Sequence, residues 1–174
     1  MQRDLYKQTS CVILSAGSSG RMGSPKALLA YDNERNFLQK IAGTYCQAGI
    51  GEVIVVVNAE LLILMRQANI ALPQNVKMVV NHKPALGRFY SLQTGLKLVT
   101  PGHSCFFQNI DNPFVSGETL DKMISFSEEA DVVKPCFGEK SGHPVLVGPT
   151  VIRAIIAEAD FTHHIDAFLR GYTL

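Results

Sequence analysis

The sequence predicts an α/β fold in which a mainly parallel β-sheet carries helices on both faces. Short apolar runs with no polar alternation recur along the chain, as in strands that are buried on both sides. The clearest run is Glu-Val-Ile-Val-Val-Val at residues 52–57, which is rich in β-branched side chains. Segments with helical spacing separate these runs, and strands that alternate with helices are typical of parallel sheets.

Apolar runs and the turn residues that close them set the bounds of the predicted strands. The run Cys-Val-Ile-Leu begins a first buried strand at residue 11, and Asn81 follows the third strand. We expect strands at residues 11–15, 52–57, 76–80, 105–110 and 131–135, and a loop at 138–144 that returns into the apolar segment 145–147.

Helices are predicted from apolar residues that share one face and from residues that begin or end a helix. Leu38, Ile41 and Tyr45 share a face of the segment that stops at Gly49, while Ser116 can cap the helix that follows it. We expect helices at residues 37–48, 60–69, 88–99, 116–129, 149–159 and 161–171.

The composition is that of an ordinary globular protein. The 174 residues are 47% apolar and 18% charged, so we expect a single domain over residues 1–174. The formal net charge of +1, without a basic block, predicts no nucleic-acid partner and no membrane partner. Residues 1–10 are polar and no apolar run approaches the roughly 18 residues that span a bilayer, so a cytoplasmic location is expected. The four cysteines lie far apart and are interpreted as small apolar core residues.

A glycine-rich stretch directly follows the first predicted strand. It runs from Leu14 to Lys26, and its three glycines permit crowded or left-handed backbone. Amides freed in such a loop can point at phosphate oxygens, and Arg21 and Lys26 can add charge-assisted hydrogen bonds. An ordinary strand-to-helix turn is the alternative. The Walker pattern is absent because Ser24 and Pro25 intervene before the lysine, and the glycine spacing is not that of a dinucleotide fingerprint.

A single carboxylate follows the fourth predicted strand. Asp111 lies before Pro113 at the edge of the sheet where ligands of parallel α/β proteins bind. Mg²⁺ takes oxygen ligands and is often held by one or two carboxylates and the phosphate oxygens of a substrate. Taken alone, Asp-x-Pro is a common turn. Together with the glycine loop, it predicts a site for a nucleoside triphosphate with its metal.

Other polar residues fall at or near the same edge. Asn81 and Ser91 could hydrogen-bond a base or ribose, although a loop or cap role for the asparagine and an exposed helix position for the serine are equally good explanations. Gly142 and His143 precede the apolar segment 145–147 and could present an imidazole to a second substrate. An ordinary loop histidine is the alternative.

The order of these motifs resembles that of the MobA-like nucleotidyltransferases. Residues 14–23, L-S-A-G-S-S-G-R-M-G, followed by Lys26 and two leucines, are similar to the family signature L-A-A-G-x-S-x-R-M-G-x-x-K-x-L-L. Residues 81–95 resemble its N-x-x-x-x-x-G-x-x-x-S-L-x-x-G segment, residues 111–113 its D-x-P, and residues 142–146 its G-H-P-V-L. The branch that looks most similar is that of the molybdenum cofactor cytidylyltransferases.

This resemblance implies a three-layer, Rossmann-like nucleotidyltransferase fold of the GT-A-like type and transfer of a nucleotidyl group with release of pyrophosphate. CMP from CTP is favoured because Ala16 is similar to the CTP-using branch, and the implied acceptor bears a phosphate, as molybdopterin cofactor does. The implied residues are Arg21, Lys26 and Asp111 for catalysis, with Asp111 also holding Mg²⁺; Leu14, Ser15, Ala16, Gly17, Ser18, Ser19, Gly20, Arg21, Lys26, Asn81 and Ser91 for the nucleotide; and Gly142 and His143 for the acceptor.

Two features depart from the family pattern. Ser15 replaces the usual alanine, and the chain ends at Leu174 without a D-I-D-T-P-like tail, so we expect a domain that is short at its C-terminus. Related proteins draw a closing element of the site from that tail. A nucleotide-binding protein that is catalytically impaired is therefore one alternative, and a sugar- or polyol-phosphate cytidylyltransferase is another.

Overall fold

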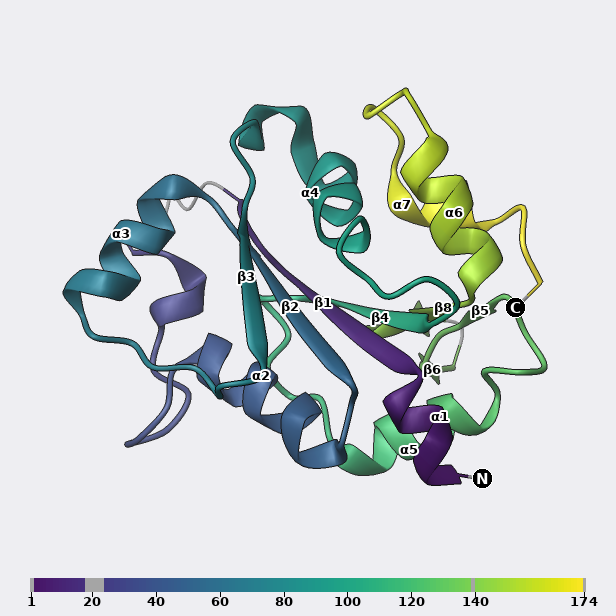
Figure 1. Cartoon of the computed structure of the whole chain (residues 1–174), viewed down its shortest axis with the longest axis horizontal. Helices are drawn as coiled ribbons and strands as arrows, with labels where there is room; N and C mark the ends of the chain where they lie inside the picture. The colour runs from purple at the N-terminus through teal and green to yellow at the C-terminus, as the bar shows by residue number, and fades with distance from the viewer. Residues whose placement is uncertain (1, 18–23, 139, 174) are drawn as a thin grey trace.

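The computed structural model describes residues 2–17, 24–138 and 140–173, and this part of the chain forms a six-stranded sheet between two layers of helices (Figure 1). In spatial order the strands are β3 (Val76–Val80), β2 (Glu52–Val57), β1 (Thr9–Ser15), β4 (Ser104–Asn109), β8 (Val145–Val147) and β5 (Val132–Val133). The first four pair in parallel, whereas β8 runs antiparallel to both of its neighbours. The predicted α/β fold with a mainly parallel sheet is confirmed.

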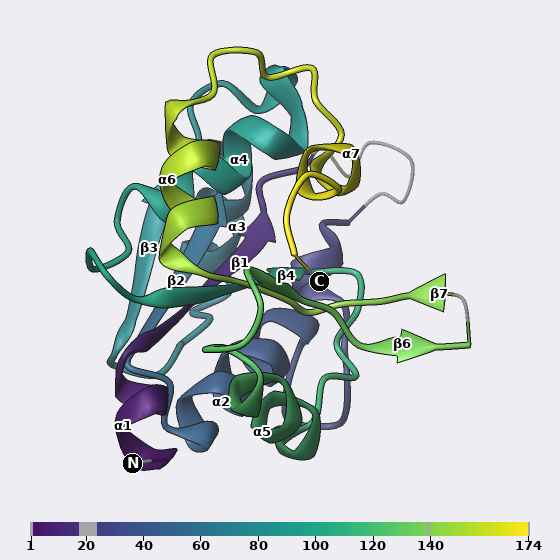
Figure 2. The same ribbon diagram turned by 90° about the vertical axis from the view of Figure 1, so that its right-hand side faces the viewer.

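Alternate residues of β1 point to opposite faces of the sheet, and each face has its own helices (Figure 2). Cys11 and Ile13 join one core, whereas Val12 and Leu14 join the other. The first core is covered by α2 (Phe37–Ala48), α3 (Ala59–Gln67) and α5 (Gly117–Ser125), and the second by α4 (Gly87–Leu96), α6 (Pro149–Ala157) and α7 (Ile165–Leu169). Within the described residues, no helix is long and apolar enough to cross a membrane.

The structure corrects the prediction around the fifth strand. The predicted strand at 131–135 is limited to β5, and Pro135 lacks the amide that would continue the ladder. The segment up to residue 141, predicted as strand end and loop, contains a small hairpin of β6 (Cys136–Phe137) and β7 (Lys140–Ser141) that projects from the sheet (Figure 2). Cys136 is therefore exposed, and the prediction that it is a core residue is wrong.

Helix ends also differ from the prediction. A short helix, α1 (Gln2–Lys7), precedes β1 where none was expected. Both α4 and α5 end earlier than expected, because the Leu98 amide bonds the Gly95 carbonyl and the Phe126 amide bonds the Met123 carbonyl. Such bonds to the third preceding residue tighten and close a helix end.

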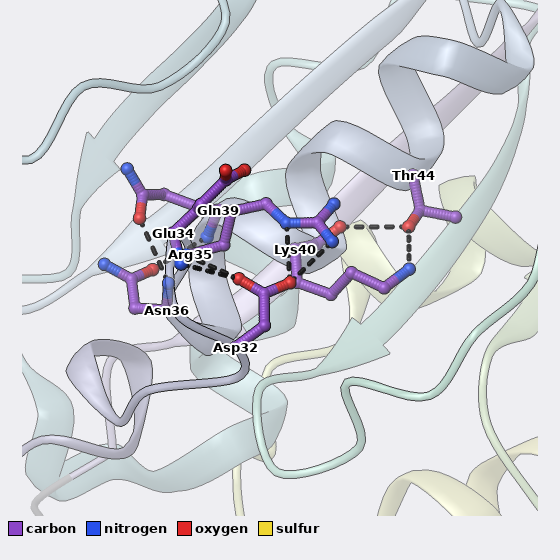
Figure 3. Close-up of polar contacts among 7 residues, drawn as sticks. All are labelled: Asp32, Glu34, Arg35, Asn36, Gln39, Lys40 and Thr44. Atoms are coloured by element: carbon purple, nitrogen blue, oxygen red, sulfur yellow. Dashed lines mark hydrogen bonds and ion pairs between the residues drawn. The ribbon is translucent and has the colours of Figure 1, made fainter.

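A capping box begins α2 and anchors the segment that follows the glycine-rich stretch (Figure 3). The Gln39 amide donates to Asn36 Oδ1 over 2.8 Å, and the Asn36 amide donates to Gln39 Oε1 over 3.1 Å. The Phe37 amide donates to the Leu29 carbonyl over 2.9 Å. These bonds satisfy donors that a helix start leaves unpaired and tie the chain just after Lys26 to the start of α2.

Candidate active site

The carboxyl ends of β1 and β4 lie side by side at one edge of the sheet. Leu14 is in register with Asn109, so the start of the glycine-rich stretch adjoins the end of β4. Lys26, in a 3-10 turn at residues 26–28, places its Nζ 3.6 Å from Oδ2 of Asp111. The two side chains are 41% and 44% exposed. A half-exposed ion pair of this kind contributes about 0–1 kcal/mol to folding, so both groups stay available to a charged ligand.

The structure places only part of the predicted nucleotide loop. Ser18, Ser19, Gly20 and Arg21 lie outside the described residues. The side chains of Leu14, Ser15 and Ala16 are buried at the end of β1, and a Cβ added at Gly17 would meet no atom of the described residues within 4 Å. The Ala16 carbonyl accepts a hydrogen bond of 3.3 Å from Asn58 Nδ2. Leu14, Ser15 and Ala16 could therefore meet a nucleotide through backbone atoms, because their side chains are packed inside the protein.

Asn81 and Ser91 are bonded to each other. Asn81 Nδ2 donates to Ser91 Oγ over 2.9 Å, and both residues are buried. Ser91 Oγ donates to the Gly87 carbonyl over 3.1 Å, while Asn81 Oδ1 accepts from the Lys83 amide over 2.7 Å. These contacts hold the segment between β3 and α4 in shape. The predicted contact of either side chain with a base or ribose stays a prediction.

His143 comes together with Asn109, a residue that the sequence did not single out. Asn109 Nδ2 lies 2.7 Å from His143 Nε2, and the imidazole packs edge-on against Phe107 with ring centroids 5.9 Å apart. Burial lowers the pKa of His143 below its ordinary value. The nearby Phe107 carbonyl opposes this shift but does not outweigh it. When Nε2 accepts from the Asn109 amide, the neutral ring carries its proton on Nδ1; this atom is buried and has no hydrogen-bond partner among the described residues.

The neighbouring Gly142 makes a backbone contact. Its amide donates to the Pro135 carbonyl over 2.8 Å, which closes the base of the β6–β7 hairpin and sets the position of His143. The only signal in the sequence for Asn109 was a polar residue at the end of an apolar strand, two positions before Asp111.

Asp111 suits a magnesium ion that is shared with a substrate. Mg²⁺ usually keeps several waters and binds through one or two carboxylates and phosphate oxygens. Asp111 offers one half-exposed carboxylate at the sheet edge, and the described residues contain no group of three or more His, Cys, Asp or Glu that could enclose a metal alone. This donor set fits a metal that takes its remaining ligands from a bound triphosphate.

The fold and this edge together define a nucleotidyltransferase-type α/β protein. The chain belongs to the MobA-like NTP transferase domain family, whose model matches residues 11–173. The Rossmann-like nucleotidyltransferase fold implied by the sequence is thereby confirmed, since solved structures of similar fold include a nucleotidyl transferase.

Proteins with similar sequences are named for different activities. The chain is 24% identical over 167 residues to nicotine blue oxidoreductase of Paenarthrobacter nicotinovorans, covering 91% of this chain and 80% of the relative. It is 24% identical over 166 residues to molybdenum cofactor cytidylyltransferase of Escherichia coli, covering 92% and 81%.

A solved structure of similar fold is Rv0371c of Mycobacterium tuberculosis. It superposes with a TM-score of 0.77 at 26% identity, covering 87% of this chain and 76% of that one. A manganese complex of Rv0371c superposes with a TM-score of 0.72 at 24% identity and the same coverage.

Proposed function

We propose that this protein transfers CMP from CTP to a phosphate-bearing acceptor, such as molybdopterin cofactor, and releases pyrophosphate. The observation that carries the proposal is the half-exposed pair of Lys26 and Asp111, 3.6 Å apart at the edge where β1 opens into the glycine-rich stretch. Such a pair offers one cation for phosphate oxygens and one carboxylate for a metal. Membership of the MobA-like family supports this assignment.

The proposed nucleotidyl transfer depends more on positioning the substrates and neutralising phosphate charge than on acid–base catalysis. An oxygen of the acceptor phosphate forms a bond to the α-phosphorus of the nucleotide, and the bond to the bridging oxygen of the pyrophosphate breaks. Because the acceptor is already an anion, no strong general base is needed. Lys26 and Arg21 would bind phosphate oxygens on which charge accumulates as pyrophosphate leaves. Mg²⁺ held by Asp111 would add Lewis-acid polarisation of the phosphate oxygens.

The choice of CTP rests on two observations. Ala16 stands where the CTP-using branch of the family has its alanine, and one relative is named a cytidylyltransferase. Sugar or polyol phosphates are alternative acceptors, and nucleotide binding without turnover is an alternative function. The relative named an oxidoreductase has comparable identity, so the test includes an arm for hydride transfer from reduced nicotinamide cofactors.

The test measures Mg²⁺-dependent pyrophosphate release from each of the four ribonucleotides with molybdopterin cofactor, glucose 1-phosphate and erythritol 4-phosphate. We expect turnover with CTP and one acceptor class. Asp111→Asn is expected to reduce turnover by roughly a hundred-fold or more, since it removes the metal-binding charge. Glu118→Gln is the matched control, because this carboxylate also sits in an exposed ion pair but belongs to α5. An unchanged rate in Asp111→Asn contradicts the proposed role of this residue.

No pyrophosphate release with any pair, while CTP still raises the melting temperature, favours the nucleotide-binding alternative. Hydride transfer from a reduced nicotinamide cofactor to added nicotine blue, the compound in the name of that relative, without pyrophosphate release favours an oxidoreductase.

A further inference from the structure

A buried glutamine holds the turn that carries Asp111. Gln108 lies on β4, is fully buried, and faces the same core as Phe106, two residues before it. Its Nε2 donates to the Asn109 carbonyl over 3.0 Å and to the Asn112 carbonyl over 2.9 Å. The Asn112 amide closes the same turn by donating to the Asn109 carbonyl over 3.3 Å. One side chain therefore ties the first and last residues of a four-residue turn in which Asp111 is third.

The orientation of this amide follows from its partners. A carbonyl can only accept a hydrogen bond, so the group of Gln108 that faces the two carbonyls must be its NH₂. Its Oε1 accepts from the hydroxyl of Tyr45, a fully buried residue of α2, over 3.1 Å. Both N–H donors and the oxygen of the amide are thus paired. A buried polar network that is satisfied in this way is rigid.

The rigid turn matters because little else holds the Asp111 side chain. That side chain is 44% exposed, so its direction depends on the backbone that carries it. The amide of Ile110 fixes the turn to β1 by donating to the Leu14 carbonyl over 3.2 Å, and the Gln108 amide fixes it to the core. Burying an amide costs free energy unless its hydrogen bonds are replaced, whereas an apolar side chain would fill this place without that cost. The bonds of Gln108 are spent on the residues that flank the site.

We propose that Gln108 is a positioning residue for Asp111: it fixes the turn so that this carboxylate points at the metal ion and stays beside Lys26. This role rests on the proposed function, in which Asp111 holds the metal of the nucleotide. Because Gln108 is fully buried, it acts only through the turn and touches no substrate. Partners that orient a metal-binding group typically change metal affinity about ten-fold to a hundred-fold when they are lost.

The experiment measures the Kd of Mn²⁺ by electron paramagnetic resonance, for the protein alone and with α,β-methylene-CTP, which cannot be cleaved at the reacting bond. Gln108→Met keeps the length of the side chain but removes its donors, and it should raise this Kd roughly ten-fold. The same substitution in the Asp111→Asn protein should change the Kd less than about two-fold, because the effect passes through Asp111. A glutamine that only stabilises the fold would lower the melting temperature equally in both backgrounds and leave the Kd unchanged in both.

Gln93→Met is the matched control. Gln93 is 2% exposed, and its Nε2 also donates to two carbonyls, those of Ile155 and Glu158, each over 2.7 Å. These bonds hold the end of α6 and not the turn with Asp111. Gln93→Met should lower the melting temperature about as much as Gln108→Met, yet change the Kd of Mn²⁺ less than about two-fold.

The outcomes separate this role from the proposed function. An unchanged Kd in Gln108→Met, or an equal rise in Gln93→Met, overturns the role of Gln108 while a loss of Mn²⁺ binding in Asp111→Asn still supports the metal site. If Asp111→Asn binds Mn²⁺ as wild type does, the metal role of Asp111 fails, and that of Gln108 fails with it. Absence of pyrophosphate release in wild type refutes the proposed transfer alone, since Mn²⁺ binding needs no turnover.

A milder variant decides the matter if Gln108→Met does not fold. Tyr45→Phe removes only the hydroxyl that donates to Gln108 Oε1 and leaves the ring in the core. It should raise the Kd of Mn²⁺ roughly three-fold, the effect of one lost hydrogen bond in the network. In that case an unchanged Kd in Tyr45→Phe refutes the role of Gln108.

Discussion

The contact of Gly95 with the sheet leads to a prediction that separates a steric effect from a backbone effect. A Cβ at this position of α4 would lie 2.4 Å from Cγ1 of Val12 and 2.8 Å from Cγ2 of Val56, so α4 or the strands must move to accept it. Overpacking of this kind costs about 1–3 kcal/mol. Alanine in a helix gains about 0.5–1 kcal/mol over glycine. Gly95→Ala should therefore destabilise the protein by about 1 kcal/mol net, with a range of about 0–2.5 kcal/mol.

Gly43→Ala is the matched control, because Gly43 is a helical glycine of α2 whose Cβ would meet nothing within 4 Å. It should stabilise the protein by about 0.5–1 kcal/mol, the backbone gain alone. Urea unfolding monitored by circular dichroism gives both free energies. The two variants differ by the steric cost of about 1–3 kcal/mol, so at about 2–4 °C per kcal/mol for a chain of this size their melting temperatures should differ by about 2–12 °C. Equal stability of the two variants would refute the steric account of how α4 packs on the sheet.

Three further predictions test the site and the sheet. Lys26→Met should lower pyrophosphate release by roughly a hundred-fold yet change the unfolding free energy by less than about 1 kcal/mol, because its ion pair is half exposed; a large loss of stability in urea would contradict this. Ser91→Ala should lower the unfolding free energy by about 1–3 kcal/mol, because it leaves the buried Asn81 amide unpaired. Calorimetry measures this loss, with Ser125→Ala, at an exposed serine of α5, as the control. Burial raises the pKa of Glu52, but hydrogen bonds from Lys77, the Thr100 amide and Ser10 outweigh it and lower the pKa from 4.5 to about 2. At pH 7 the unfolding free energy of Glu52→Gln should therefore be lower than that of the wild type by up to about 3 kcal/mol. In urea titrations this difference should shrink as pH falls from 4.5 towards 2. A constant difference over that range would show that the charge of Glu52 is not its cause.

The sequence alone determined the sheet and the edge that carries the site. β2 is apolar at every position after Glu52, and such an unbroken apolar run is typical of a buried parallel strand. This pattern therefore placed the glycine-rich stretch and Asp111 at the carboxyl-terminal edge of the sheet, and the order of motifs identified the family; the structure showed that β1 and β4 are neighbours. The cysteine in β6 was misjudged because an apolar residue near a strand end has no local mark that distinguishes a core from a projecting hairpin.

Only the tertiary structure decided which polar side chains meet. Lys26 and Asp111 are 85 residues apart, and Asn109 and His143 are 34 residues apart, so no local pattern could pair them. Asn81 and Ser91 stand at motif positions, yet their side chains bond each other because both are buried where β3 meets α4. A pocket lies beside the end of β4 because the segment at residues 159–166 returns there. Hydrophobic spacing reports which face of an element is buried, whereas the partner of a buried polar atom depends on long-range packing.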